Sequence, residues 1–298
     1  MAGGGNGIFH EDMNYREVLC KPSISGKNLS STSTLENEKN VNCQKQPETG
    51  AIGPFRLLSM HLDRAVSHVR SAVDQRRKLN IAICNAHTLL TAFDDAEYAH
   101  LLQSMTLLND GIGVNIANNF LNGQSFPDNL NGTDFVPYML KTIGVPLRIY
   151  LFGAHDAQLV GAAATIRERY PDHIIVGQRS GYFEAGEVPA ICREISEAKP
   201  DLLLVAMGNP RQERFIMEHQ DSLDVPVAIG VGALFDFMSG SVARAPRVLQ
   251  VIGLEWLFRL TLEPRRLFRR YIIGIPRFLF AIFKLRLGRR GKAAPESL

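Results

Sequence analysis

The hydrophobic pattern of the chain changes near residue 50. Residues 1–50 are rich in Ser, Asn, Thr, Lys and Glu and show no sustained apolar period, so we expect a disordered leader there. From residue 51 onwards, short apolar runs alternate with segments whose apolar positions recur every three or four residues. This alternation predicts that strands and helices follow one another along the chain.

Six apolar runs are typical of strands, and amphipathic segments separate them. We expect strands in "LNIAICN", "MTLLN", "LRIYLFG", "HIIVGQ", "DLLLVAMG" and "PVAIGVG". The segments "LLSMHLDRAVSHVRSAV", "AHTLLTAFDDAEYAHLLQ", "GIGVNIANNFL" and "RQERFIMEHQ" are among those predicted to be helical. Continuous apolar strands that alternate with helices are typical of a parallel sheet covered on both faces. The sequence therefore predicts an α/β fold with a doubly wound, mostly parallel, Rossmann-like sheet.

Charge separates the last part of the chain from the rest. Residues 255–292 hold eleven Arg or Lys against two Glu, a local net charge of +9 in a chain whose total is +3. The run "YIIGIPRFLFAIFKLRL" is too short and too charged for a transmembrane helix, which needs ~20 apolar residues. It is typical of a basic amphipathic helix on anionic lipid, and the alternative is a helix docked on the acidic body of the same chain. No nucleic-acid motif accompanies this basic segment, so a nucleic-acid partner is not predicted.

These patterns predict three parts. We expect a leader over 1–50, an α/β catalytic domain over 51–243 and a basic, amphipathic, membrane-associating helical appendage over 244–298. The N-terminus lacks the basic and apolar regions of a secretion signal, and the four cysteines show no disulfide or zinc spacing, so a reducing cytoplasm is predicted. No HExxH, Cys/His cluster or DxD pair is present, so neither a bound metal nor a cofactor is predicted.

Ligands of a doubly wound sheet bind beyond the carboxyl ends of its strands, and this rule selects the candidate residues. Asp110 is either the N-cap of the following helix or a general base, and the local sequence leaves both open. The "GNPRQE" turn is either a plain strand-to-helix connection or a phosphate site, and the "GVGALFDFMSG" loop could likewise hold a diphosphate. The candidates at these strand ends are Asn85, Asp110, Gly208, Arg211, Gln212, Gly232 and Asp236. The histidines show no ligand spacing, so packing or surface roles are predicted for them.

The stretches "LLNDGIGVNIA", "NLNGTDF", "PDLLLVAMGNPRQERFI", "GVGALFDFMSGSVARAPRVLQVIGLEW" and "FRLTLEPRRLFRRY" together resemble the WecG/TagA/CpsF family of bacterial glycosyltransferases, glycosyltransferase family 26. The resemblance covers about residues 55–271. It implies a metal-independent, inverting transfer of a sugar, of the glucose or N-acetylmannosamine type, from a UDP-sugar to a polyprenyl-diphosphate-linked saccharide. Such an enzyme works peripherally at the cytoplasmic face of the inner membrane, in exopolysaccharide or surface-glycan biosynthesis.

The same resemblance assigns roles to individual residues. It implies that Asp110 is the general base and that Asn85 and Gln212 line the pocket. Asn129 is a further candidate, in a loop where the family often has Arg, and Ile83 stands where some members have Thr, so the donor sugar stays open. The appendage arginines implied to meet the diphosphates are Arg259, Arg265, Arg266 and Arg269.

Two other functions compete with this one. A nucleotide-sugar epimerase or dehydrogenase would need a GxGxxG turn after the first strand, and none is present. A non-catalytic, membrane-peripheral scaffold of a polysaccharide assembly complex would keep the fold and the basic appendage without turnover. The sequence does not decide whether the chain is a monomer or a homo-oligomer.

Overall fold

A computed structural model describes residues 49–246, 248–249 and 253–292. The predicted leader lies outside the described residues except for its last two positions. The described chain begins with an antiparallel hairpin of β1 (Thr49–Ile52) and β2 (Phe55–Leu58). The prediction that a helix begins at Leu57 was wrong, because Leu57 lies in β2, where it pairs with Leu107, and α1 (Leu62–Asp74) begins only at Leu62.

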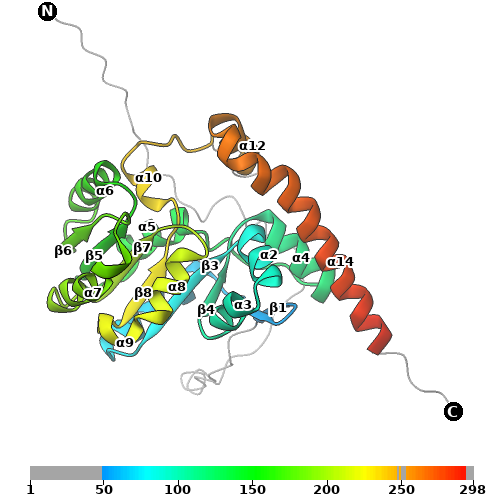
Figure 1. The fold of residues 1–298 in the computed structure, drawn as a ribbon, viewed down its shortest axis with the longest axis horizontal. Helices are drawn as coiled ribbons and strands as arrows, with labels where there is room; N and C mark the ends of the chain where they lie inside the picture. Colours follow the sequence, from blue (N-terminus) through cyan, green and yellow to red (C-terminus); the bar gives the residue numbers. More distant parts are fainter. Residues whose placement is uncertain (1–48, 247, 250–252, 293–298) are drawn as a thin grey trace, which may run out of the picture. The chain divides into compact units, whose positions relative to one another are not determined.

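The eight strands form one sheet in the order β1-β2-β4-β3-β8-β7-β5-β6 (Figure 1). All six predicted strands are present: β3 (Leu79–Cys84), β4 (Thr106–Asn109), β5 (Arg148–Gly153), β6 (Ile174–Arg179), β7 (Leu202–Ala206) and β8 (Val227–Gly230). Every neighbouring pair is parallel except β1 and β2. The predicted doubly wound, mostly parallel α/β fold is therefore confirmed.

Helices cover both faces of the sheet. Successive residues of the central strands point to opposite faces, so each face is apolar and needs its own layer of helices. Ile81 and Ile83 of β3 pack under the first layer, whereas Ala82 and Cys84 pack under the second. The first layer contains α1, α5 (Gly132–Thr142), α6 (Asp156–Arg169) and α10 (Leu234–Met238). The second contains α2 (Ala86–Asp94), α3 (Ala96–Gln103), α4 (Ile112–Asn122), α7 (Val188–Glu197), α8 (Arg211–Glu218) and α9 (Gln220–Leu223).

The segment predicted as one helix over residues 86–103 is two helices. Asp95 has an extended backbone between α2 and α3, and its carboxylate accepts a hydrogen bond of 3.0 Å from the backbone N–H of Tyr98. A carboxylate in this position satisfies an N–H group that a new helix would otherwise leave unpaired. Asp95 therefore ends one helix and begins the next.

The basic C-terminal segment is helical, as predicted. It consists of α12 (Glu255–Leu262), α13 (Pro264–Phe268), a π-helical turn η2 (Arg269–Ile273) and α14 (Gly274–Lys292). Helix α14 runs along α2 and α4, and its Phe278 and Ile282 are buried there (Figure 1). Arg277 pairs with Asp94 at 3.1 Å, so the helix does dock on the acidic body of its own chain. Among the described helices, none is long and apolar enough to cross a membrane.

Candidate functional site

The strand ends of β3 and β4 bring Asn85 and Asp110 together. Asn85 is the N-cap of α2, and its side-chain oxygen accepts hydrogen bonds of 3.1 Å from the backbone N–H groups of His87 and Thr88. This cap fixes which end of the Asn85 amide points into the site. The amide nitrogen donates to Oδ2 of Asp110 at 3.2 Å. Asn85 therefore caps helix α2 and also donates a hydrogen bond to the carboxylate of Asp110.

Asp110 does not cap the helix that follows it, so that alternative was wrong. The N-cap of α4 is Gly111, and no side chain makes a cap hydrogen bond there. Gly111 has φ 84° and ψ 164°, a conformation almost restricted to Gly, and its N–H donates to Oδ1 of Asn129 at 2.8 Å. Asn129 thus fixes the turn that carries Asp110.

Asp110 is a half-buried residue, and the burial of its carboxyl group raises the pKa of that group. The hydrogen bond from Asn85 and the charges of Arg270 and Arg259 oppose the rise, whereas the nearby charge of Asp134 adds to it. The result is a carboxylate more basic than an ordinary Asp, on a residue that is only partly buried. Such a group can accept a proton from a bound hydroxyl.

Two arginines of the appendage face Asp110. Arg259 of α12 has a buried Nε without a hydrogen-bond partner among the residues that the structure describes, and its guanidinium lies 5.1 Å from the centre of the Phe237 ring. The charge of Arg270 in η2 acts on both Asp110 and His87. Burial, together with this charge, lowers the pKa of His87 to about 4, whereas at Asp110 the charge only opposes the rise. His87 is therefore neutral at pH 7. These arginines put positive charge beside the carboxylate.

Arg270 was not among the arginines predicted from the sequence. The run "RRLFRRY" does not show which arginine faces the body, and the π-helical turn, with its wider spacing, places Arg270 there. Of the four predicted arginines, Arg259 is the one whose charge acts on Asp110 among the residues that the structure describes. Arg265 and Arg269 are exposed, and the side chain of Arg266 lies outside the described residues. Roles for these three stay predictions.

Further charged groups surround Asp110. Asp134 of α5 pairs with Arg244, which precedes the appendage helices. Glu255, at the start of α12, has a raised pKa because it is buried, and the charges of Arg244, Asp134, Arg259 and Asp110 all act on it. The appendage thus contributes charges of both signs to the surroundings of Asp110.

The predicted glycines of two other loops are tied together by Gln212. This residue is buried, and its side-chain oxygen accepts hydrogen bonds from the backbone N–H groups of Gly208 at 3.2 Å and Gly232 at 3.0 Å. The backbone N–H groups of Gly208 and Gly232 are therefore already bonded to a side chain of the protein. Of the other two candidates in these loops, Arg211 is exposed in the first turn of α8 and Asp236 is partly exposed in α10.

A second buried carboxylate, Glu213, was not anticipated from the sequence. Its side chain accepts hydrogen bonds from the Tyr98 hydroxyl at 3.0 Å, the Asn209 amide at 2.6 Å and the Gln212 amide at 2.7 Å. Burial raises the pKa of Glu213, and the amide and hydroxyl donors oppose the rise. The only available signal was its position next to a strand-end turn, which does not distinguish a buried Glu from an exposed one.

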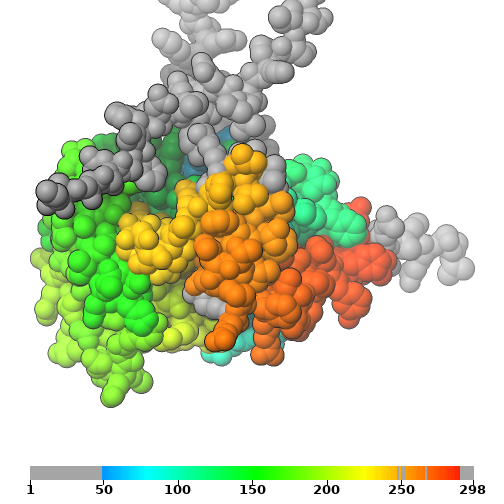
Figure 2. All heavy atoms as spheres, turned by 90° about the horizontal axis from the view of Figure 1, so that it is seen from above, coloured from blue at the N-terminus to red at the C-terminus, as the bar shows by residue number. Residues whose placement is uncertain are grey.

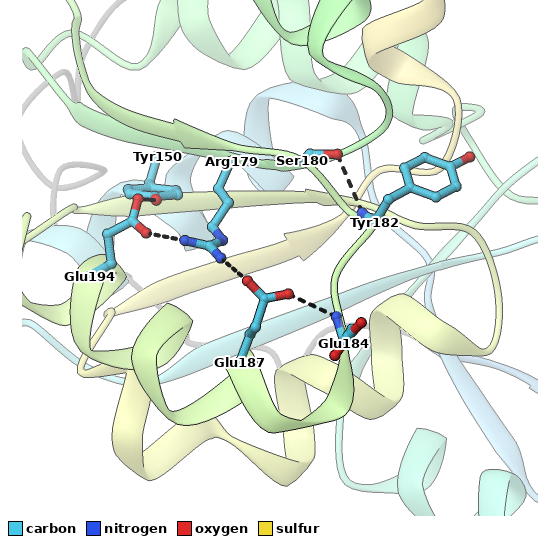
Figure 3. Close-up of polar contacts among 7 residues, drawn as sticks. All are labelled: Tyr150, Arg179, Ser180, Tyr182, Glu184, Glu187 and Glu194. Carbon is cyan, nitrogen blue, oxygen red and sulfur yellow. Dashed lines mark hydrogen bonds and ion pairs between the residues drawn. The ribbon is translucent and has the colours of Figure 1, made fainter.

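An aromatic pair lies at the ends of β5 and β6. The rings of His155 and Tyr182 stack at 4.0 Å with an angle of 10°, and Tyr182 is mostly exposed. Arg179, at the end of β6, anchors the same loop by ion pairs with Glu194 at 2.8 Å and Glu187 at 2.9 Å (Figure 3). The loop therefore offers a supported flat surface at the carboxyl edge of the sheet. Within the described part of the chain, no three His, Cys, Asp or Glu side chains gather closely enough to hold a metal ion.

The fold is an α/β fold whose candidate residues Asn85 and Asp110 lie together at the carboxyl edge of a mostly parallel sheet. The model of the "Glycosyl transferase WecG/TagA/CpsF family" matches residues 52–292, so the chain belongs to this family. The resemblance drawn from the sequence motifs is thereby confirmed.

Three relatives carry the same name, N-acetylglucosaminyldiphosphoundecaprenol N-acetyl-beta-D-mannosaminyltransferase. The chain is 32% identical to the Bacillus subtilis protein over 214 residues, which cover 71% of this chain and 82% of the relative. Identity to the Bacillus spizizenii protein is 28% over 240 residues, covering 80% and 91% of the two chains. Identity to the Staphylococcus aureus protein is 27% over 223 residues, covering 74% and 86%.

Proposed function

We propose that the chain transfers a sugar from a UDP-sugar to a polyprenyl-diphosphate-linked saccharide with inversion at the anomeric carbon. The observation that carries the proposal is Asp110, a partly exposed residue whose carboxylate has a raised pKa, receives a hydrogen bond from Asn85 and feels the charges of two arginines. Inversion needs one base on the face opposite the leaving group.

Asp110 is the proposed base. It takes the proton of the acceptor hydroxyl while the hydroxyl oxygen forms a bond to the anomeric carbon of the donor. The bond between that carbon and the diphosphate oxygen breaks on the opposite face, and UDP leaves with the electron pair. A single displacement of this kind produces inversion and needs no second carboxylate as a nucleophile.

The charge that develops on the leaving diphosphate needs positive groups. Arg259 and Arg270 are suited to this role because both lie within electrostatic reach of Asp110. The exposed Arg265 and Arg269, together with Arg266, are proposed to meet the diphosphates at the outer side of the site. Tyr182, supported by His155, offers a ring face on which a nucleobase can stack.

The acceptor and donor are proposed from the names of the relatives. Those proteins are named for transfer of N-acetylmannosamine to an N-acetylglucosaminyl-diphosphate lipid, so we propose the same acceptor class here. UDP-N-acetylmannosamine is the first donor to test and UDP-glucose the second. The basic appendage is proposed to hold the enzyme peripherally on the anionic cytoplasmic face of the membrane.

A donor screen tests the proposal. The full chain is incubated with a short-chain N-acetylglucosaminyl-diphosphate lipid and, separately, with UDP-N-acetylmannosamine, UDP-glucose and UDP-N-acetylglucosamine. We expect one donor to give product, with a β-linkage by NMR from an α-linked donor and at the same rate with EDTA present. Product of retained configuration would contradict the single displacement, and transfer that EDTA abolishes would contradict metal independence. Absence of transfer from every donor, with binding to vesicles intact, would favour the scaffold.

A further inference from the structure

Helix α4 exposes an apolar stripe that begins two residues after Asp110. Ile112, Ile116 and Phe120 are 45%, 50% and 44% exposed. Their spacing of four residues puts them on one side of the helix. The opposite side, with Val114 and Leu121, is buried in the core. The stripe is therefore apolar surface that the core of the α/β body leaves about half-exposed.

Helix α14 exposes a second apolar stripe. Leu279, Phe280, Phe283 and Leu287 are between 42% and 58% exposed, whereas Phe278 and Ile282 on the opposite side are buried against the body. A helix that is apolar on both its inner and its outer side has more apolar surface than docking on its own chain requires.

The two stripes lie side by side. Helix α14 packs on α4, where the Arg286 guanidinium is 5.6 Å from the centre of the Phe120 ring and donates to the carbonyl of Leu121 at 2.8 Å. With 3.6 residues per turn, Leu279 and Phe283 lie on the same flank of α14 as Arg286, and hence toward α4. Figure 2 shows α4, in teal, adjoining α14, in red. Together Ile112, Ile116, Phe120, Leu279, Phe280, Phe283 and Leu287 form what we call the apolar platform.

The charges around the platform are positive. Lys284 lies over the Phe280 ring at 4.6 Å from its centre, and Arg286 lies between the two stripes. The segment from residue 255 to residue 292 has a net charge of +9. Large aliphatic and aromatic side chains bordered by Lys and Arg suit the boundary between acyl chains and anionic headgroups.

We infer that the platform is the bilayer-facing surface of the protein and that α4, a helix of the α/β body, inserts beside α14 into an anionic membrane. This inference rests on the membrane association proposed above and adds the body itself to the contact. Because α4 begins next to Asp110, the carboxylate would lie at headgroup depth. A lipid-linked acceptor could then present its sugar without leaving the bilayer.

Tryptophan quenching by brominated lipid tests this placement. Trp256 is the only Trp of the chain, so Phe120→Trp, Phe280→Trp and Val160→Trp are each made in a Trp256→Phe background. Val160 is 59% exposed on α6, in the other helical layer. With vesicles of brominated phosphatidylcholine and phosphatidylglycerol, we expect strong quenching of the Trp at 120 and at 280 and none at 160.

The outcomes separate this inference from the one on which it rests. Quenching at 280 without quenching at 120 would overturn the insertion of α4 and leave the membrane association intact. Failure of all three variants and of the unmodified chain to bind vesicles would overturn both. A dimer in solution that Phe120→Ser dissociates, with the Trp at 120 shielded from lipid, would show that a second copy covers the stripe, and would also overturn the inference.

A second measurement uses loss of the stripe. The double variant Ile116→Ser/Phe120→Ser should bind anionic vesicles about tenfold more weakly, because two half-exposed apolar side chains no longer enter the bilayer. Its transfer to a short-chain, water-soluble acceptor should match that of the unmodified chain. Val160→Ser is the matched control and should bind vesicles normally. Equal vesicle binding by the double variant and the unmodified chain would contradict the inference.

Discussion

Asp110 and Glu213 both lie at the carboxyl edge of the sheet, but they accept different numbers of side-chain hydrogen bonds. Both carboxyl groups have a pKa raised by burial, and both act on the thiol of Cys84 between them. Glu213 is fully buried and accepts from three side chains. Asp110 is half-buried and accepts a side-chain hydrogen bond from Asn85.

The difference indicates a structural role for Glu213 and leaves Asp110 as the candidate for a chemical role. Buried donors that lose their acceptor cost free energy, so the three donors around Glu213 hold it and the β7–α8 turn in place. Its acceptor sites are occupied, which leaves no room for a substrate hydroxyl. Asp110, by contrast, has one side-chain donor among the described residues, Asn85, and the charges of Arg259 and Arg270 act on it. Acid strength alone would not distinguish the two groups.

The largest expected effect comes from an isosteric exchange at each carboxylate. Asp110→Asn should lower the rate of transfer by about 10²–10⁴-fold, because the base is lost while the shape is kept. Glu213→Gln should keep most of the rate, because its amide can donate to the Tyr98 oxygen while its carbonyl accepts from Asn209 and Gln212. Initial rates at saturating donor measure both.

The comparison needs folding controls. Thermal melts of both variants should lie within a few degrees of the unmodified chain, and Asp110→Asn should still bind vesicles. If Glu213→Gln lost as much activity as Asp110→Asn with a normal melt, Glu213 would have to be counted among the groups that act on the substrate. Normal transfer by Asp110→Asn would remove Asp110 from the mechanism.

Glu213→Leu should be the most destabilising change at the second carboxylate. The leucine leaves the Tyr98 hydroxyl and two amides without their acceptor in a fully buried place, which should cost about 3–5 kcal/mol of unfolding free energy. Urea unfolding followed by circular dichroism measures it. Glu213→Gln is the matched control, and a loss below 1 kcal/mol for Glu213→Leu would mean that the network does not hold the turn.

Much of this arrangement follows from sequence, for a physical reason. Central parallel strands are continuous apolar runs because both faces are buried, so β3 to β8 could be found, and the rule for strand ends then brought Asn85 and Asp110 into one site. Strand β2 was missed because Leu57 and Leu58 also fit the start of an amphipathic helix, and β1 was missed because its first two residues were assigned to the leader. Asp95 was missed because a cap inside a helical pattern resembles an ordinary polar position.

The rest depended on tertiary contacts that no local pattern encodes. Neither the burial of Glu213 nor the choice of Arg270 over its neighbours is visible in "NPRQE" or "RRLFRRY". Asp110 was predicted to be either a helix N-cap or a general base. The first alternative was excluded only by the backbone structure, because Gly111 is the N-cap of α4. The second role of Asn85, as a helix cap, likewise became visible only in the structure.

A smaller effect is expected at Asn85, where the two roles can be separated. Asn85→Ser keeps a capping hydroxyl for α2 but removes the amide donor to Asp110. That donor lowers the pKa of Asp110, so its loss should raise the pKa further. The base works when deprotonated, so the rate rises with pH through this pKa, and the acid limb should move to higher pH. The transfer rate of both proteins is measured as a function of pH. The melting temperature of Asn85→Ser should be nearly that of the unmodified chain. An acid limb at the same pH in both proteins would contradict the prediction.

The smallest expected effect is at Tyr98, whose hydroxyl donates to the buried Glu213. Tyr98→Phe should cost about 1 kcal/mol, or about 2–4 °C in the melt, because one carboxylate oxygen loses a donor. Burial raises the pKa of Glu213 and this donor opposes the rise, so the hydroxyl stabilises the charged form. Its contribution is therefore present above the pKa of Glu213 and is lost as pH falls through it, so the cost of Tyr98→Phe should shrink as the pH is lowered through this raised pKa.

Tyr150→Phe is the matched control for this last change. The Tyr150 hydroxyl also donates to a glutamate, Glu194, but that side chain is 44% exposed, so water can replace the lost donor. The cost of Tyr150→Phe should therefore be below that of Tyr98→Phe. In the double variant Tyr98→Phe/Glu213→Leu the loss should fall short of the sum of the single losses, because both changes remove the same hydrogen bond. Equal costs for the two tyrosines, or additive losses in the double variant, would show that burial does not distinguish Glu213 from a surface carboxylate.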